Sequence, residues 1–209
     1  MKRKVHFMNT EPKYIQDLTE IRSMMERSTK CLSLTGWSGI MAGVYALAGA
    51  YIAYEVFHFN ETRNLNRESA EFLPLFLLAM AILALTIGTA AMLSFRKASK
   101  TGERLWNAAA RRLLINMAIP LVTGGILILI FYSKGFIELL APVTLIFYGL
   151  ALINASKFSY EEFKYLGLIE IVLGLTATYF TGHGLLIWAL GFGVAHIIYG
   201  IYMHLSFEK

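Results

Sequence analysis

The feature that most constrains this sequence is a series of apolar runs, each about long enough to cross a lipid bilayer. A helix needs roughly 20 apolar residues to cross the hydrocarbon core, where only a helix satisfies its own backbone hydrogen bonds in a run of this kind. We therefore expect an all-α, polytopic integral membrane protein with six transmembrane helices. These are predicted at Leu32–Phe57, Phe72–Phe95, Leu113–Tyr132, Phe136–Ala155, Tyr165–Phe180 and Leu185–His204.

The composition supports the same class of fold. Of the 209 residues, 56% are hydrophobic and 16% are charged, whereas soluble domains average ~45–50% and ~25%. This excludes an ordinary soluble enzyme and a disordered chain. The single cysteine, Cys31, excludes an intramolecular disulfide and a cysteine-based zinc site. The chain therefore divides into a cytoplasmic amphipathic segment, residues 1–31, and a six-helix transmembrane bundle, residues 32–209.

The positive charges predict how the bundle is oriented. Sixteen Lys and Arg residues fall before the first run, between the second and third, between the fourth and fifth, and at the C-terminus, and three fall in the opposite loops. Because cytoplasmic loops carry an excess of Lys and Arg, we expect both termini to be cytoplasmic. The protein is then a multi-pass protein of the plasma membrane, by preference a bacterial inner membrane. This topology accounts for the net charge of +5, so no nucleic-acid partner is expected.

Two polar segments could contact the membrane surface or a partner. Residues 11–30 carry one apolar stripe at helical spacing, with charges on the other faces, which is typical of an amphipathic helix. This helix either lies along the inner leaflet or docks a protein partner or a second copy. The basic segment before the third run either binds anionic headgroups or only sets the topology. Its candidate headgroup contacts are Arg104, Arg111 and Arg112.

Glycines predict where the helices pack. Small residues let helix backbones approach closely, usually inside one bundle and less often between copies. Similar sequences around Tyr148-Gly149 and Tyr199-Gly200 indicate a diverged repeat, which would fit three stacked hairpins. The candidate packing residues are Gly39 and Gly43 in the first run, Gly167 and Gly174 in the fifth, and Gly193 and Gly200 in the sixth.

One polar residue lies between each of the last two pairs of glycines. Glu170 lies between Gly167 and Gly174, and His196 between Gly193 and Gly200. Helical periodicity places each polar residue on the glycine face, which should face another helix. Asn116 and Asn154 lie in the same half of the bundle and are candidate polar lining. We therefore predict a proton-handling cluster, or a purely structural one, around Glu170 and His196.

Two classes of function remain open. The sequence lacks the zinc-protease, nucleophile-elbow and Walker motifs, so we expect no enzyme, catalytic residue, metal or cofactor. One class is a non-enzymatic sensor or scaffold, with the intramembrane Glu-His cluster and a docking N-terminal helix. The alternative is a small proton-coupled transporter or channel that uses Glu170 and His196. Its partners would be the lipid bilayer and either another protein or a second copy of the chain.

Overall fold

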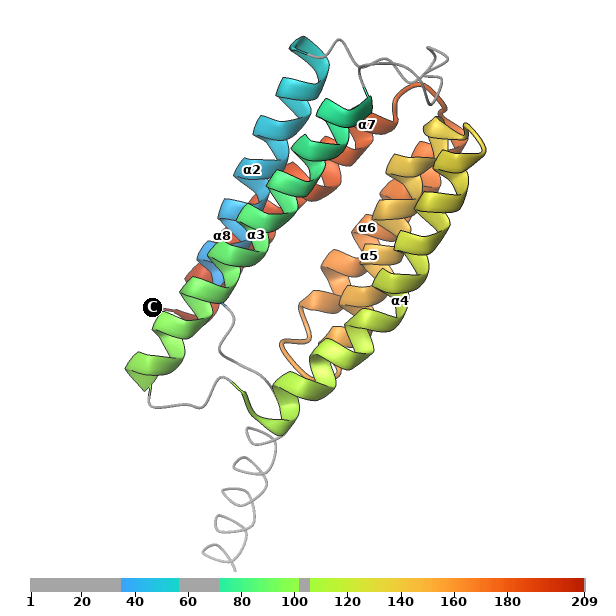
Figure 1. Cartoon of the computed structure of the whole chain (residues 1–209). Helices are drawn as coiled ribbons and strands as arrows, with labels where there is room; N and C mark the ends of the chain where they lie inside the picture. The colour runs from blue at the N-terminus through green and yellow to red at the C-terminus, as the bar shows by residue number, and fades with distance from the viewer. Residues whose placement is uncertain (1–34, 57–71, 102–105, 209) are drawn as a thin grey trace, which may run out of the picture.

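The computed structural model describes residues 35–56, 72–101 and 106–208, and the regular elements in these segments are all helical. The predicted N-terminal helix and Arg104 lie outside the described residues. Figure 1 shows the helices running side by side as a bundle. They are α2 (Gly36–Glu55), α3 (Phe72–Thr101), α4 (Ala108–Ser133), the short η1 (Ile137–Leu139), α5 (Leu140–Ser156), α6 (Phe163–Tyr179), α7 (Gly184–Trp188), the π-helical η2 (Ala189–Ala195) and α8 (His196–Phe207).

The described helices confirm the expected all-α fold, and their lengths and compositions are compatible with a membrane protein. Among the described residues, five helical segments are long and apolar enough to cross a membrane: α2, α3, α4, η1 with α5, and α7 with η2 and α8. The remaining predicted span corresponds to α6, which has 17 residues. Most predicted boundaries are accurate to a few residues, but α3 continues to Thr101 instead of ending at Phe95, and α4 begins at Ala108 instead of Leu113. The extra turns of α3 are polar, and the last of them contains Lys100, whose charge favours a helix C-terminus.

Local sequence explains where several helices begin and turn. The Thr35 side chain accepts a hydrogen bond from the Ser38 N–H, and Asn107 does the same for the Ala110 N–H at 2.8 Å. Both residues therefore act as N-caps, which satisfy a free backbone donor. Gly135, with a φ of 80°, lies in the tight connection that follows α4, where a residue without a Cβ adopts a positive φ without strain.

Two antiparallel helix pairs, α5–α6 and α2–α8, approach each other closely at glycines. A Cβ placed on Gly149 of α5 would lie 2.5 Å from the Gly167 carbonyl oxygen of α6. In the second pair, a Cβ on Gly200 of α8 would lie 2.6 Å from the Gly36 carbonyl oxygen of α2. Only glycine permits backbones to approach this closely. The predicted glycine faces therefore pack within the bundle.

The two pairs share one register. The residues of α2 that contact α8 correspond one by one to the residues of α6 that contact α5. The equivalent positions are Gly36 and Gly167, Ile40 and Ile171, and Gly43 and Gly174. The partner positions are Gly200, Ile197 and Gly193 in α8, and Gly149, Ile146 and Pro142 in α5.

This register revises the predicted hairpin repeat. The Tyr-Gly sequences at residues 148–149 and 199–200 do occupy equivalent positions, as the repeat predicts. Each glycine, however, packs against a helix outside its predicted hairpin: Gly149 against α6, and Gly200 against α2. The same backbone contact at glycines therefore joins two helices that are neighbours in the chain, α5 and α6, and two that are far apart in it, α2 and α8.

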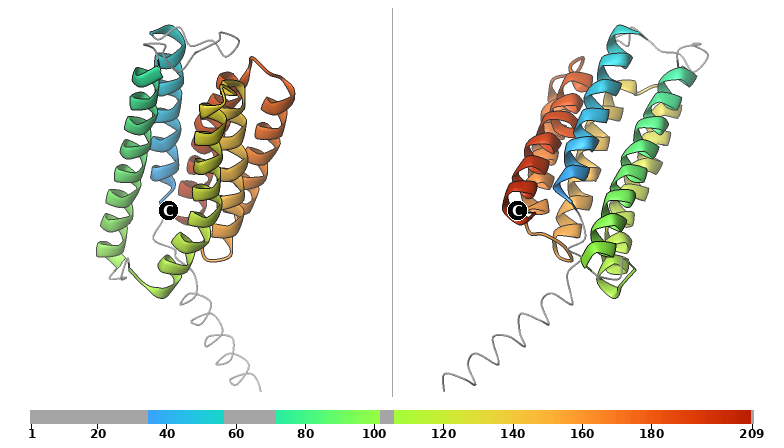
Figure 2. Two further views of the ribbon diagram at one scale, coloured as in Figure 1. Left: turned by 45° about the vertical axis from the view of Figure 1, so that its right-hand side comes forward. Right: turned by 90° about the vertical axis from the view of Figure 1, so that its left-hand side faces the viewer.

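The helices form two groups, which Figures 1 and 2 show from three sides. One group contains α2, α3 and α8, and the other contains α4, α5 and α6. Contacts of α6 with η2, and of α5 with α7, connect the groups. At one end of the bundle α2, α4 and α6 begin and α3, α5 and α8 finish; we call this the C-terminal end.

Candidate functional site

The structure brings Glu170 and His196 together near the middle of their helical segments. The Glu170 Oε1 atom of α6 lies 3.3 Å from the Nδ1 atom of His196, the first residue of α8. Glu170 is fully buried and His196 is 4% exposed. Neither carboxylate oxygen of Glu170 makes a hydrogen bond to the described residues. We call these two residues the Glu170–His196 pair.

His196 makes two further contacts that define its protonation pattern. Its Nδ1 atom lies 3.0 Å from the carbonyl oxygen of Gly191, which can only accept, so Nδ1 carries a proton and donates. Its Nε2 atom lies 2.9 Å from the Tyr148 hydroxyl. In the neutral imidazole Nε2 accepts from Tyr148, and in the charged imidazolium Nε2 donates to it. Both forms of His196 are therefore accommodated.

The π-helical segment η2 shapes this site. Gly191 and Gly193 lower the local preference for a regular α-helix, and the wider turn places the Gly191 carbonyl beside the His196 ring. A Cβ on Gly191 would lie 2.6 Å from Glu170 Oε2 and 2.6 Å from Leu145 Cδ2. Glycine is therefore required for the carboxylate to lie directly against the backbone of η2. Single π-turns inside α-helices occur frequently at functional sites.

A column of aromatic rings covers the pair on the side away from the C-terminal end. Phe192 stacks on the His196 ring with centroids 5.7 Å apart, and Trp188 packs on Phe192 at 5.0 Å. The Tyr148 ring contacts Phe192 at 4.8 Å and His196 at 5.4 Å. These rings hold the imidazole in place and exclude water from that side.

The other predicted polar residues do not join the pair. The Asn116 amide donates to the Arg112 carbonyl of its own helix at 2.8 Å. Asn154 is half-buried, and among the described residues no hydrogen bond links it to Glu170 or His196. Arg111 and Arg112 are exposed in the first turns of α4. A basic side chain there can lay its hydrocarbon stem against apolar surface and keep its charged group in water.

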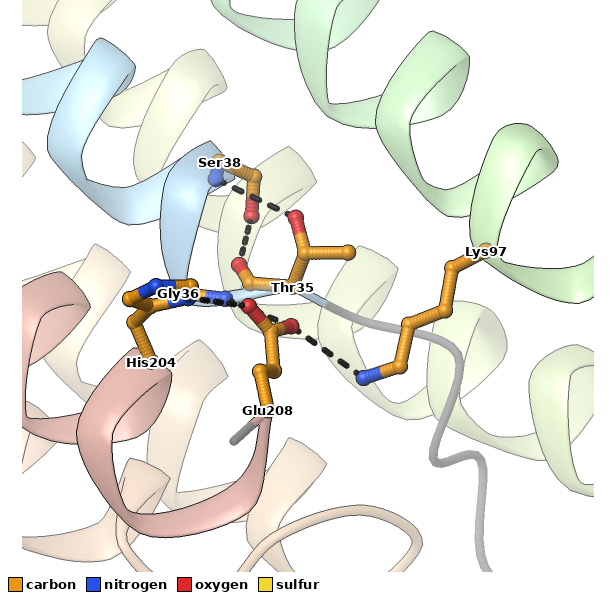
Figure 3. A network of polar contacts seen from close by, with 6 residues as sticks. All are labelled: Thr35, Gly36, Ser38, Lys97, His204 and Glu208. Atoms are coloured by element: carbon orange, nitrogen blue, oxygen red, sulfur yellow. Dashed lines mark hydrogen bonds and ion pairs between the residues drawn. The ribbon is translucent and has the colours of Figure 1, made fainter. Parts of the chain in front are cut away.

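A second polar cluster lies at the C-terminal end (Figure 3). Glu208 accepts from Lys97 of α3 at 3.2 Å, from the Gly36 N–H of α2 at 3.2 Å and from His204 of α8 at 2.9 Å. Burial of the Glu208 carboxyl opposes its ionisation, but the hydrogen bonds from His204, Lys97 and Gly36 and the charge of Lys97 hold its pKa below the ordinary value. This cluster ties three helices together.

Several residues of these sites were missed in the sequence. In the sequence, Tyr148 stands out only as part of the Tyr-Gly repeat. The two rings that it contacts, Phe192 and His196, lie four residues apart on one helical face, which was a usable signal for an aromatic partner. Gly191 is not among the predicted packing residues, because it lies two residues before Gly193 and so falls off that helical face. The spacing of His204 and Glu208, at i and i+4, was a usable signal for the second cluster.

The Glu170–His196 pair consists of a carboxyl group and an imidazole held 3.3 Å apart. Among the described residues no group of three or more His, Cys, Asp or Glu side chains lies together as a metal site. Comparisons with protein-family models, with curated proteins and with solved structures found no match. The geometry of the Glu170–His196 pair is therefore the main guide to function.

Proposed function

We propose that this protein is a non-enzymatic integral membrane protein that senses protons through the Glu170–His196 pair. The observation that carries the proposal is the distance of 3.3 Å between two ionisable side chains that are both buried in the middle of the bundle. Ionisable residues inside a membrane are costly and usually functional. Electrical neutrality favours two states, the ion pair and the doubly neutral pair.

A change in the proton count of the pair leaves a net charge in an apolar interior. The surrounding helices then relieve that charge by moving, which makes the pair a switch. The contact most directly affected joins α8 to α2, because a Cβ on Gly39 would lie 3.3 Å from the His196 carbonyl oxygen. Since α2 follows the N-terminal segment, we propose residues 1–31 as the output, through a docked protein partner or a second copy.

The proposed location is the plasma membrane, with both termini in the cytoplasm. The charge bias of sixteen Lys and Arg residues against three supports this orientation. The C-terminal end of the bundle, with Lys97 and the first turns of α4, would then face the cytoplasm. Arg111 and Arg112 would contact lipid headgroups there.

Proton-coupled transport is the second candidate function. The observation that favours it is the lack of a hydrogen bond to either Glu170 oxygen among the described residues. A buried carboxyl group in this state is suited to bind and release a transported proton. Transport would require a proton flux that depends on Glu170, whereas sensing requires only a change of conformation.

The test follows the fluorescence of Trp188, which packs on the ring that stacks on His196. In Trp37→Phe/Trp106→Phe protein reconstituted in liposomes, we expect the emission to change when the pH is varied, because a change in the proton count of the pair alters the charge beside these rings. Glu170→Gln and His196→Gln should abolish the change while circular dichroism shows a retained fold. His183→Gln, at an exposed turn, is the control and should leave the change intact.

The outcomes separate the two candidates. A flat emission profile in the parent, or an unaltered profile in Glu170→Gln, would refute the sensor. A proton flux in the same liposomes that Glu170→Gln removes would instead establish the transporter.

A further inference from the structure

A second buried hydroxyl lies between the Glu170–His196 pair and the C-terminal end. Tyr199 follows His196 by three residues, so it lies on the same side of α8, about one turn nearer that end. The Tyr199 hydroxyl oxygen is buried and makes no hydrogen bond to the described residues. Leaving a buried hydroxyl unpaired costs about 1–3 kcal/mol, so its retention calls for an explanation.

The surroundings of Tyr199 lead toward the start of α6. Its ring packs on Phe163, the first residue of α6, with centroids 5.5 Å apart. The preceding residue, Glu162, is half-exposed and is the N-cap of α6. The contact with Phe163 therefore places Tyr199 between His196, one turn away along α8, and the start of α6, where Glu162 lies at the C-terminal end.

We infer that protons reach the Glu170–His196 pair from the C-terminal end, through a route formed by Glu162, Tyr199 and Tyr148. This inference rests on the proposed function, because it names how the proton-sensing pair is supplied. Glu162 collects the proton, and the two hydroxyls relay it to Nε2 of His196, with bound water completing the steps that direct contact does not make.

The relay is chemically balanced. Each tyrosine hydroxyl accepts one proton and donates its own, so it is regenerated and carries no lasting charge. The net result is one proton moved from Glu162 to the pair, without an oxidant or a reductant. The last step uses the 2.9 Å contact between Tyr148 and His196.

The other elements around the pair supply no competing route in the described residues. The face of α2 toward His196 is glycine, at Gly39, and η2 contributes the Gly191 carbonyl. On the side away from the C-terminal end, the Phe192 and Trp188 rings stack over the imidazole. Among the titratable groups of the described residues, Tyr148 of α5 contacts His196 directly, and Tyr199 follows one turn farther along α8.

The route is tested by the rate at which the His196 ring N–H exchanges with solvent. The full chain is labelled with ¹⁵N-histidine, and exchange is measured by nuclear magnetic resonance, with His196→Gln used to assign the signal. Tyr199→Phe should slow exchange on the order of a hundredfold, the lower end of what a positioned proton-transfer group contributes. Tyr202→Phe, which alters an exposed tyrosine three residues further along α8, is the matched control and should exchange like the parent.

A second variant keeps the test decisive. Glu162→Gln removes the proton-collecting group without changing a buried residue, and it should also slow exchange. Unchanged exchange in a folded Tyr199→Phe protein, or in Glu162→Gln if Tyr199→Phe does not fold, would overturn the route. Slow exchange in these variants combined with flat Trp188 fluorescence in the parent would support the route and refute the sensor, so the two failures are distinguishable.

Discussion

At the scale of single residues, Gly191 is the position where the least change should have the largest effect on the Glu170–His196 pair. Its missing side chain leaves the space that Glu170 Oε2 and Leu145 occupy. Gly191→Ala should destabilise the protein by about 1–3 kcal/mol, because overpacking a tight interior displaces its neighbours. Thermal unfolding in detergent measures this. Gly125→Ala is the control, since a Cβ there would meet nothing within 4 Å.

Glu208 makes stability depend on pH at the other site. Its pKa is lower in the folded protein than the ordinary 4.5, so its stabilising effect is complete above that value and is lost as pH falls through the folded-state pKa. Glu208→Gln should cost about 1.5–3 kcal/mol at neutral pH, the usual value of a hydrogen bond to a charged group. The difference from the parent should shrink in acid.

Denaturation of Glu208→Gln and the parent at a series of pH values provides the measurement. Glu138→Gln, at an exposed position in η1, is the matched control. An equal cost at every pH would show that the ionised carboxylate is not what stabilises the cluster in Figure 3.

At the scale of helices, the shared register makes a paired prediction. Gly149→Ala and Gly200→Ala occupy equivalent positions, and their added methyl groups would lie 2.5 and 2.6 Å from a carbonyl oxygen of the facing helix. Both should therefore lower the unfolding free energy, by about 1–3 kcal/mol each. Gly88→Ala, with nothing near its Cβ, should be neutral or should stabilise α3 by about 0.5–1 kcal/mol. Similar costs at both positions, measured by chemical denaturation, are the expected result.

The helices themselves were largely predictable from the sequence, because an apolar run of sufficient length has few alternatives. The glycine faces were predictable for the same kind of reason, since small residues recur at helical spacing. The pairing of α2 with α8 was not, because it depends on contacts between opposite ends of the chain. The π-turn at Ala189–Ala195 was also missed, since Gly193 fits the glycine face of a regular α-helix.

At the scale of the whole molecule, orientation in the membrane is the prediction that other proposals depend on. Replacing Cys31 with serine leaves a chain without cysteine, into which Lys157→Cys and Lys134→Cys can be introduced singly. These exposed positions lie at opposite ends of the bundle. In intact cells, a membrane-impermeant maleimide should label Cys at 134 and not at 157, as the charge bias predicts.

Labelling of both sites after the cells are opened is the control for accessibility. The reverse pattern in intact cells would place the termini outside. It would also make the Glu162–Tyr199 route a path from the exterior.

The shared register has a consequence for connectivity. The short link from α5 to α6 joins two helices whose counterparts, α8 and α2, contain the two ends of the described chain, held together where Glu208 meets the Gly36 N–H. The place where the end of α8 meets the start of α2 therefore corresponds to the turn that joins α5 to α6. A circular permutant that begins at α6 and ends at α5, with a short linker after Glu208, would retain both sets of glycine contacts.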